Sequence, residues 1–227
     1  HLTGIALADT DLVARHTFRA VARSSGLAVS FAPVVFAGLV GNGRVFNGTT
    51  SFISAGSAAA VDDVFSGGGT ISAWIRPTGW GEAGYGRIVS KAPTTFNGSS
   101  NGDGWNLQLD GTNQSLIFEI GFGTNPGRWD TPVGSIVLNT WQQVTVVYDN
   151  QSVANAPKIY INGVQVPATR ISTPSGASTS DAALPLTVGN QAANTNRTFA
   201  GAIDEVRLYN SARSGAQIAA DYRAGTG

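Results

Sequence analysis

Hydrophobic and polar residues alternate with a period of two over much of this chain. The longest example is residues 199–210, in which Ile203, Val206 and Leu208 stand among charged side chains. Alternation of this kind predicts a half-buried β-strand, and a local slip in its phase indicates that the strand changes face. Shorter alternating stretches recur along the sequence, so we expect about a dozen strands. The clearest of these stretches are 105–110, 115–120, 142–149 and 158–161.

Residues that favour turns separate the alternating stretches. Three dipeptides stand out, namely Asn47–Gly48, Asp110–Gly111 and Asn162–Gly163. Both residues of such a pair tolerate positive φ angles, which the tight primed turns of β-hairpins require. We therefore expect a hairpin turn at each of the three.

A single helix is expected, at the C-terminus. Ser214 and Gln217 have the spacing of a capping box, in which each side chain bonds to a backbone N–H of the other residue. A short Ala-rich segment follows and extends to Tyr222. This combination predicts that the last strand is followed by a short helix.

Four segments together resemble the laminin-G-like, concanavalin A-like jelly roll, the lectin/glucanase sandwich. They are residues 41–53, 69–77, 139–164 and the closing segment that begins at 199. The first is similar to the opening hairpin of that family, the second to its first long strand, and the third to its central strand and hairpin. The resemblance implies an all-β fold, a two-sheet antiparallel jelly-roll sandwich with one short C-terminal helix. We assign residues 10–227 to this domain and residues 1–9 to an N-terminal arm without a counterpart in the family.

Composition limits the classes of function. A chain of 227 residues suits one large sandwich domain and buries roughly 70% of its unfolded surface. The formal net charge is zero and no stretch is strongly basic, so we expect no nucleic-acid binding. No apolar run approaches the ~20 residues that cross a bilayer, so we expect no membrane insertion.

Cysteine and methionine are absent, which excludes disulfides and thiolate metal sites. The abundance of Asn, Gly and Thr fits a protein of the extracellular space, a cell surface or the exterior of a virus particle. Arg greatly outnumbers Lys, and the only lysines are Lys91 and Lys158.

We expect no enzymatic activity. Retaining glycosidases need two carboxyl groups about 5 Å apart across the sugar bond. The three glutamates, Glu82, Glu119 and Glu205, do not share a strand. Asp130 or Asp149 could pair with Glu119 across strands, but nothing in the sequence requires it. The motifs of serine hydrolases, zinc proteases and phosphate-binding loops are also missing.

Aromatic residues in predicted loops are the candidates for ligand binding, because a ring can stack on the apolar face of a sugar. Trp80 and Tyr85 lie in the Gly-rich segment 79–86, and Trp129 lies in the segment 125–130. Arg128 and Asp130 flank Trp129 and could bond to sugar hydroxyls. The alternative is that each ring caps one end of the core.

Trp74 lies within a predicted strand and is expected in the core. It shares its alternation face with Ser72 and Arg76 rather than with the apolar positions, however, so it could instead lie on the concave sheet face under a loop and form the floor of a ligand site.

The resemblance also implies one structural calcium ion between the closing strand and the opening hairpin. Asp204 would supply a carboxylate, and carbonyl groups near Asn47 and Gly48 would complete the oxygen ligands. The alternative is that Asp204 bonds to a neighbouring loop or pairs with an arginine. Asp62 and Asp63 form a second candidate, although adjacent loop carboxylates are usually only solvated.

Two functions are compatible with these observations. The first is a non-catalytic recognition or adhesion module on an exterior surface, which binds a glycan or a surface protein through loops. The second is a structural subunit, such as a decoration or fibre protein of a virus particle or part of a cell-surface filament. In the second case residues 1–9 could pair with the sheet edge of another copy or subunit.

Overall fold

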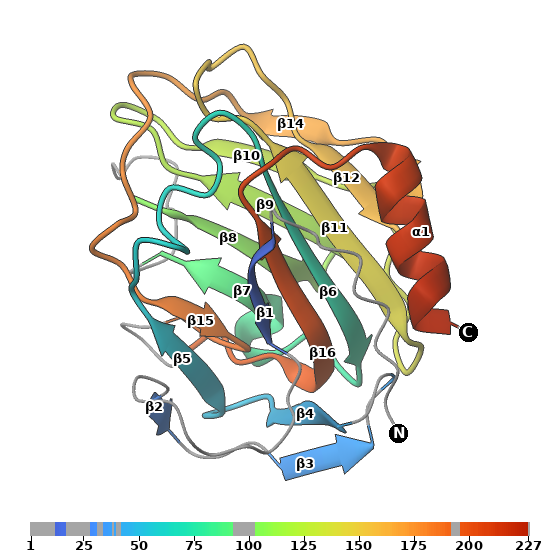
Figure 1. Cartoon of the computed structure of the whole chain (residues 1–227). Helices are drawn as coiled ribbons and strands as arrows, with labels where there is room; N and C mark the ends of the chain where they lie inside the picture. The colour runs from blue at the N-terminus through green and yellow to red at the C-terminus, as the bar shows by residue number, and fades with distance from the viewer. Residues whose placement is uncertain are drawn as a thin grey trace.

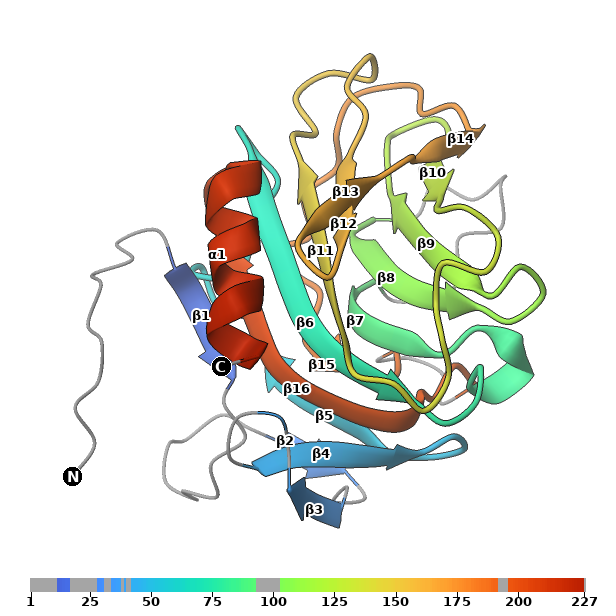
Figure 2. The ribbon, with the colours of Figure 1, turned by 90° about the vertical axis from the view of Figure 1, so that its right-hand side faces the viewer.

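The computed structural model describes residues 12–16, 28–30, 34–37, 39, 42–92, 103–191 and 196–226. They form two antiparallel sheets, packed face to face, each of eight strands (Figures 1 and 2). The expected all-β jelly-roll sandwich is therefore confirmed. The proposed N-terminal arm, residues 1–9, lies outside the described residues.

We name the two sheets A and B. Sheet A has the order β13-β12-β11-β6-β16-β4-β3, and β1 pairs with the remaining length of β16. Its strands are β1 (Leu12–His16), β3 (Val34–Ala37), β4 (Asn42–Asn47), β6 (Gly69–Pro77), β11 (Gln142–Tyr148), β12 (Lys158–Ile161), β13 (Val164–Val166) and β16 (Ala200–Tyr209).

Sheet B has the order β14-β10-β9-β8-β7-β15-β5-β2. Its strands are β2 (Ala28–Ser30), β5 (Phe52–Gly56), β7 (Arg87–Lys91), β8 (Trp105–Asp110), β9 (Ser115–Ile120), β10 (Gly127–Asp130), β14 (Thr169–Ser172) and β15 (Leu186–Val188). A short 3-10 helix, η1 (Glu82–Gly84), precedes β7, and α1 (Gly215–Thr226) follows β16.

The core lies between the sheets and is built by alternation along the strands. In β6, Ile71, Ala73 and Ile75 point inward and are fully buried. Aromatic rings fill the part of the core near sheet B, where they meet mostly edge to face, an arrangement that aromatic pairs prefer. These rings belong to Phe65, Trp105, Phe118, Trp129 and Tyr148.

The slip in the pattern of the closing strand is a β-bulge in β16. The register against β6 shifts between Asp204 and Arg207, and Glu205 adopts a φ of 47°. Ile203 and Val206 can therefore both point into the core, although they are three positions apart. The expected change of face is a real feature of the backbone.

Helix α1 covers the outer face of sheet A, the face turned away from sheet B (Figure 2). The capping box is confirmed, since Ser214 N–H donates to Gln217 Oε1 at 2.9 Å and Gln217 N–H donates to Ser214 Oγ at 3.3 Å. Trp74 stacks on Tyr222 of this helix with ring centroids 5.4 Å apart. Trp74 therefore packs beneath α1, and the alternative that it forms the floor of a ligand site is wrong.

The three expected turns differ in form. Asn162 and Gly163 have φ angles of 53° and 76° and connect β12 to β13 tightly, as expected for a primed turn. Asp110–Gly111 begins a longer hairpin loop between β8 and β9. Asn47–Gly48 is not a hairpin turn, because it leads from β4 in sheet A to β5 in sheet B.

Within the described part of the chain, no helix has both the length and the apolar character needed to cross a membrane.

Candidate functional site

The outer face of sheet B carries polar side chains on four neighbouring strands. In β8, Leu107 and Leu109 point into the core, so Asn106, Gln108 and Asp110 point outward. Residues directly opposite one another across strands share a face, which extends this polar surface to β7, β9 and β10. We call it the polar face; its members are Arg87, Ser90, Asn106, Gln108, Asp110, Ser115, Glu119, Arg128 and Asp130.

Most of these side chains are buried, yet several of their polar atoms have no hydrogen-bond partner. Within the described part of the chain, the atoms without a partner include Arg87 Nε and Nη1, Asn106 Oδ1 and Gln108 Oε1. The hydroxyl groups of Ser90 and Ser115 also have no hydrogen-bond partner. Buried polar groups in folded proteins nearly always have partners, and leaving one unpaired costs about 1–3 kcal/mol. A concentration of such atoms on one face therefore indicates a place that takes a polar ligand or ordered water.

A buried pair of opposite charges lies at the centre of the polar face. Arg87 Nη1 is 4.0 Å from Glu119 Oε2, which also accepts a hydrogen bond of 3.1 Å from the Asn106 amide. Burial raises the pKa of Glu119, although Arg87 and the Asn106 amide oppose this shift. Burial likewise lowers the pKa of Arg87 to about 10, against the attraction of Glu119. Both shifts have the same cause, the loss of water around a charged group.

Arg128 and Asp130 form a rigid, partly exposed fork on β10. Arg128 Nε and Nη2 each donate to one carboxylate oxygen of Asp130 at 2.8 Å. This pairing contributes most to raising the pKa of Arg128. The Arg128 side chain remains 28% exposed, and its Nη2 is also 3.9 Å from Asp110 Oδ2. The structure thus places two of the expected binding residues on the polar face, with fixed orientations.

Trp129 does not have the expected position. It was expected in a loop, but it lies in β10, and its ring is 0% exposed. Because Arg128 and Asp130 point outward, alternation turns Trp129 inward, where its ring packs on Phe118 and Tyr148. Trp129 is therefore a core residue, and its ring has no face free to stack on a ligand.

Trp80 and Tyr85 lie in a loop, as expected, but their surroundings differ. The backbone of this loop is hydrogen-bonded to the end of β8. Leu109 N–H donates to the Gly86 carbonyl, and Gly111 N–H donates to the Gly84 carbonyl. The Trp80 ring is partly buried against the core, and a Cβ atom at Gly111 would lie 2.7 Å from Trp80 Cβ. Trp80 thus caps one end of the core, which was the alternative stated for it.

Tyr85 borders the polar face. Its partly buried ring lies 5.7 Å from the guanidinium carbon of Arg197, a cation–π contact. The Arg197 carbonyl accepts a hydrogen bond from Arg87 N–H, so Tyr85, Arg197 and Arg87 are close neighbours. Since β7 and β8 are antiparallel, Tyr85 lies at the same end of the sheet as Asp110.

The residues expected to bind calcium are not brought together. Asn47 lies opposite Ala200 of β16, and Asp204 follows four residues later, about 13 Å further along the strand. The Asn47 side-chain oxygen accepts hydrogen bonds from the backbone N–H groups of Thr49, Thr50 and Ser51. Asp204 is fully buried and accepts a bond from the N–H of Glu205. Asp204, Asn47 and Gly48 therefore do not form the expected ligand set, and the described residues contain no group of three or more His, Cys, Asp or Glu placed to hold a metal ion.

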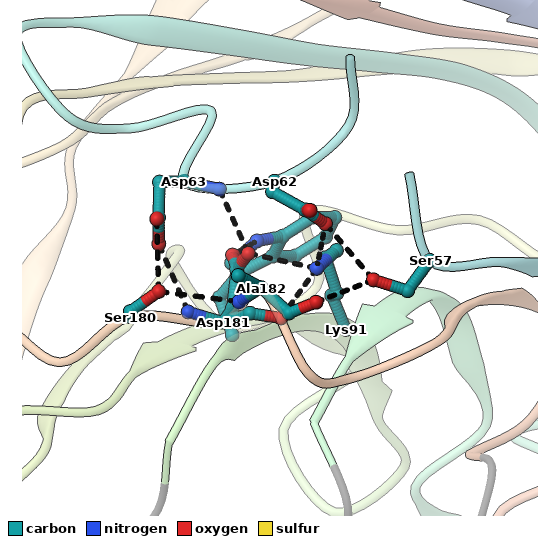
Figure 3. A network of polar contacts seen from close by, with 8 residues as sticks. Ser57, Asp62, Asp63, Lys91, Ser180, Asp181 and Ala182 are labelled. Atoms are coloured by element: carbon teal, nitrogen blue, oxygen red, sulfur yellow. Dashed lines mark hydrogen bonds and ion pairs between the residues drawn. The ribbon is translucent and has the colours of Figure 1, made fainter. Parts of the chain in front are cut away.

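The second candidate for calcium, Asp62 and Asp63, belongs to a network around Lys91 (Figure 3). The Lys91 ammonium donates to Asp62 Oδ1 at 2.7 Å, to Asp181 Oδ1 at 2.8 Å and to the Asp181 carbonyl. Asp63 accepts from the backbone N–H of Asp181, whose other carboxylate oxygen accepts from the Trp105 indole N–H. We call this group the Lys91 network. Its cation is a lysine side chain from β7, so these loop carboxylates are neither merely solvated nor arranged around a metal ion.

Several residues of the polar face were not identified from the sequence. The prediction rested on aromatic residues in loops, so it did not include Arg87, Asn106 and Gln108. The signal was present, because the alternation of Asn106 and Gln108 with Leu107 and Leu109 already places the two amides on the outer face. The sequence could not reveal that the side-chain oxygen of each amide is buried without a hydrogen-bond partner.

Comparison with known proteins gives the family of the chain. Residues 46–219 match the family described as the Concanavalin A-like lectin/glucanases superfamily. The chain belongs to this superfamily. The resemblance seen in the sequence is thus confirmed. A comparison with curated proteins finds no match.

Solved structures with the superfamily fold are similar over nearly the whole chain. The binding domain of Paraclostridial Mosquitocidal Protein 1 aligns with a TM-score of 0.65 at 16% identity, covering 95% of this chain and 52% of that one. The binding domain of botulinum neurotoxin serotype G aligns with a TM-score of 0.67 at 15% identity, covering 94% of this chain and 51% of that one. The chain thus spans about half the length of these toxin binding domains.

A third similar structure is a domain of comparable size. Domain 4 of AbnA, an extracellular arabinanase from Geobacillus stearothermophilus, was solved in complex with arabinotriose. It aligns with a TM-score of 0.57 at 18% identity, covering 93% of this chain and 98% of that one. At such identities the similarity establishes a shared fold and nothing more.

Proposed function

We propose that this chain is a non-catalytic recognition module that binds a glycan through the polar face of sheet B. The observation that carries the proposal is the set of buried donors and acceptors without partners on neighbouring strands of that face. Sugar-binding sites combine a few convergent polar groups with an aromatic or apolar surface. Tyr85 supplies an aromatic ring at the border, and the Arg128–Asp130 fork supplies exposed hydrogen-bonding groups.

The similar structures support this choice of function. Two of them are toxin binding domains, and a third is an arabinanase domain in complex with arabinotriose. We extend from these proteins only the class of activity, which is binding to a glycan or to a receptor. Such partners occur on exterior surfaces, so we propose an extracellular or cell-surface location for the protein that contains this chain.

We propose that the polar face does not hydrolyse the ligand it binds. Glycoside hydrolysis needs two carboxyl groups that flank the scissile bond and are free to exchange protons or attack carbon. Asp130 is held by two hydrogen bonds from Arg128, and Glu119 accepts a bond from Asn106 and faces Arg87. The carboxylates of Asp130 and Glu119, the two that could flank a scissile bond here, therefore already interact with partners within the protein.

A glycan-array screen followed by calorimetric titration tests the proposal. The unchanged protein should bind at least one oligosaccharide, and Tyr85→Ala and Arg128→Gln should each weaken that binding. Tyr85→Phe, which keeps the ring, and Arg223→Ala, which removes an exposed arginine of α1 on the other sheet, serve as controls. Binding that is unaffected by both polar-face variants would refute this site. Release of sugar that Glu119→Gln abolishes would refute the non-catalytic assignment.

A further inference from the structure

We propose that a pocket at one end of the sandwich binds a monovalent metal cation, Na⁺ or K⁺. The pocket has a volume of about 170 Å³ and lies where three connections between strands meet. These connections join β5 to β6, β11 to β12, and β14 to β15. The pocket shares no residue with the polar face, so this inference does not depend on the proposed function.

Every side chain that lines the pocket carries an oxygen atom. The lining consists of one carboxylate, one amide and four hydroxyl groups, which belong to Asp63, Asn150, Ser66, Ser178, Thr179 and Ser180. Oxygen atoms are the ligands that hard metal cations prefer in proteins. A water molecule takes up about 30 Å³ in the liquid, so the pocket has room for an ion together with several waters.

Two of these side chains are buried without satisfying their hydrogen-bonding capacity. Asn150 is only 7% exposed, and within the described part of the chain its Oδ1 has no hydrogen-bond partner. The hydroxyl oxygen of Thr179 is also buried without a partner. Buried polar atoms in folded proteins nearly always have partners, so these two indicate a ligand. An amide oxygen and a hydroxyl oxygen both offer lone pairs, which suits a metal cation.

Contacts within the protein fix the positions of the amide and the carboxylate. Asn150 N–H donates to the Phe65 carbonyl at 3.0 Å, which joins the connection after β11 to the connection before β6. Asp63 Oδ1 accepts from the Asp181 N–H and its Oδ2 accepts from Ser180 Oγ, both at 2.9 Å (Figure 3). Each carboxylate oxygen keeps a further lone pair after these bonds. An ion could therefore bind without any of these contacts breaking.

The charges next to the pocket favour a cation. In the Lys91 network, the ammonium group pairs with Asp62 and Asp181, whereas Asp63 accepts from neutral donors. Burial is the main cause that raises the pKa of Asp181, and the negative charge of Asp63 adds to this rise. A cation in the pocket would offset the charge of Asp63. Because Asp62 accepts from Lys91, the two adjacent carboxylates do not share this ion.

The number of charged ligands favours a monovalent ion over calcium. Of the residues that line the pocket, Asp63 is the one that carries a negative charge, and the others are neutral. Calcium sites gain affinity from several carboxylates. Neutral oxygen atoms, by contrast, are sufficient to replace the hydration shell of K⁺. One carboxylate with neutral oxygens thus matches a single positive charge.

Thermal unfolding in different chloride salts tests the proposal. The unchanged protein should melt at least about 2 °C higher in NaCl or KCl than in tetramethylammonium chloride of equal ionic strength, because an ion that binds the folded state stabilises it. Thr179→Val should lose this difference, since valine has a similar shape but no oxygen. Thr173→Val is the matched control, because Thr173 is an exposed threonine of the same connection and should keep the difference.

Equal melting temperatures of the unchanged protein in the three salts would overturn the proposal. A difference that Thr179→Val retains in full would also overturn it, because the ion would then bind elsewhere. A rise of several degrees with millimolar calcium that Thr179→Val abolishes would overturn the choice of a monovalent ion.

Crystals of the unchanged protein decide the matter if Thr179→Val does not fold. They would be grown with NaCl or soaked in RbCl, since rubidium replaces potassium and scatters anomalously. An ion with oxygen ligands in the pocket, in either salt, would support the proposal, whereas water alone in both would overturn it. None of these results depends on whether the polar face binds a sugar.

Discussion

Replacing Lys91 by methionine should destabilise the protein severely. Lys91 is 0% exposed, and its ammonium group donates to Asp62 Oδ1, Asp181 Oδ1 and the Asp181 carbonyl. Methionine has nearly the length and volume of lysine, so the change removes the charge without creating a large cavity. Asp181, which is buried, and Asp62, which is partly buried, then lose the ammonium group that both of them accept from.

The magnitude follows from what the aspartates retain. Removing one partner of a buried ion pair usually costs about 3–5 kcal/mol. Asp181 still accepts hydrogen bonds from the Trp105 indole at 2.9 Å and from the Asp63 N–H at 2.8 Å, and Asp62 is only partly buried. These contacts favour the lower end of the range, so we expect a loss of about 3 kcal/mol. Since a domain is stable by only about 5–15 kcal/mol, this is a large fraction of the total.

Urea denaturation followed by Trp fluorescence measures the effect. Lys158→Met is the matched control, because Lys158 is the only other lysine and its side chain is exposed. We expect this control to change the free energy of unfolding by less than about 0.5 kcal/mol. A loss below about 1 kcal/mol for Lys91→Met would contradict the network, since it would mean that the aspartates do not depend on the ammonium group.

Three further predictions concern the core, the polar face and calcium. Trp129→Ala should lower the free energy of unfolding by about 3–5 kcal/mol, whereas Tyr85→Ala should cost less than about 1 kcal/mol; equal losses in urea titrations would contradict the placement of the two rings. Burial raises the pKa of Glu119 above 4.5, so the stability from its protonated form is complete below that pH and is lost as the pH rises through the folded-state pKa. Glu119→Gln should therefore gain stability relative to the unchanged protein as the pH rises above 4.5, and a difference in denaturation midpoint that does not change with pH would argue against the raised pKa. Adding millimolar calcium or a chelator should leave the melting temperature unchanged within about 1 °C, because Asp204 and Asn47 lie apart; a rise of several degrees with calcium would show a site that these residues do not make.

The features that could be predicted from the sequence are those governed by local patterns. Alternation in residues 199–210 predicted strand β16, and the slip in that alternation predicted the position of its bulge. Both follow because the apolar residues of a strand must all point to its buried face. The capping box gave the start of α1, since it depends on residues only three positions apart. These signals need no knowledge of what lies across the core.

Features that depend on distant parts of the chain were mispredicted or missed. Trp129 was placed in a loop because Pro126 and Gly127 precede it, but the alternation of Arg128, Trp129 and Asp130 was already that of a short strand. The Lys91 network joins residues 90 positions apart in the sequence, so its pairing could not be read from composition or spacing. The same applies to the side-chain oxygens of Asn106 and Gln108, because their burial without a partner depends on how distant parts of the chain pack around them.

An NMR titration that follows side-chain amide signals while an oligosaccharide is added tests directly whether the polar face is the binding site. If the ligand binds there, the amide signals of Asn106 and Gln108, on the outer face of sheet B, should shift in proportion to binding, while the signal of Gln165, on β13 of sheet A, should stay in place. Shifts confined to Gln165 or to the indole of Trp74 beneath α1 would place the ligand on sheet A, and they would contradict the assignment of the polar face as the binding site.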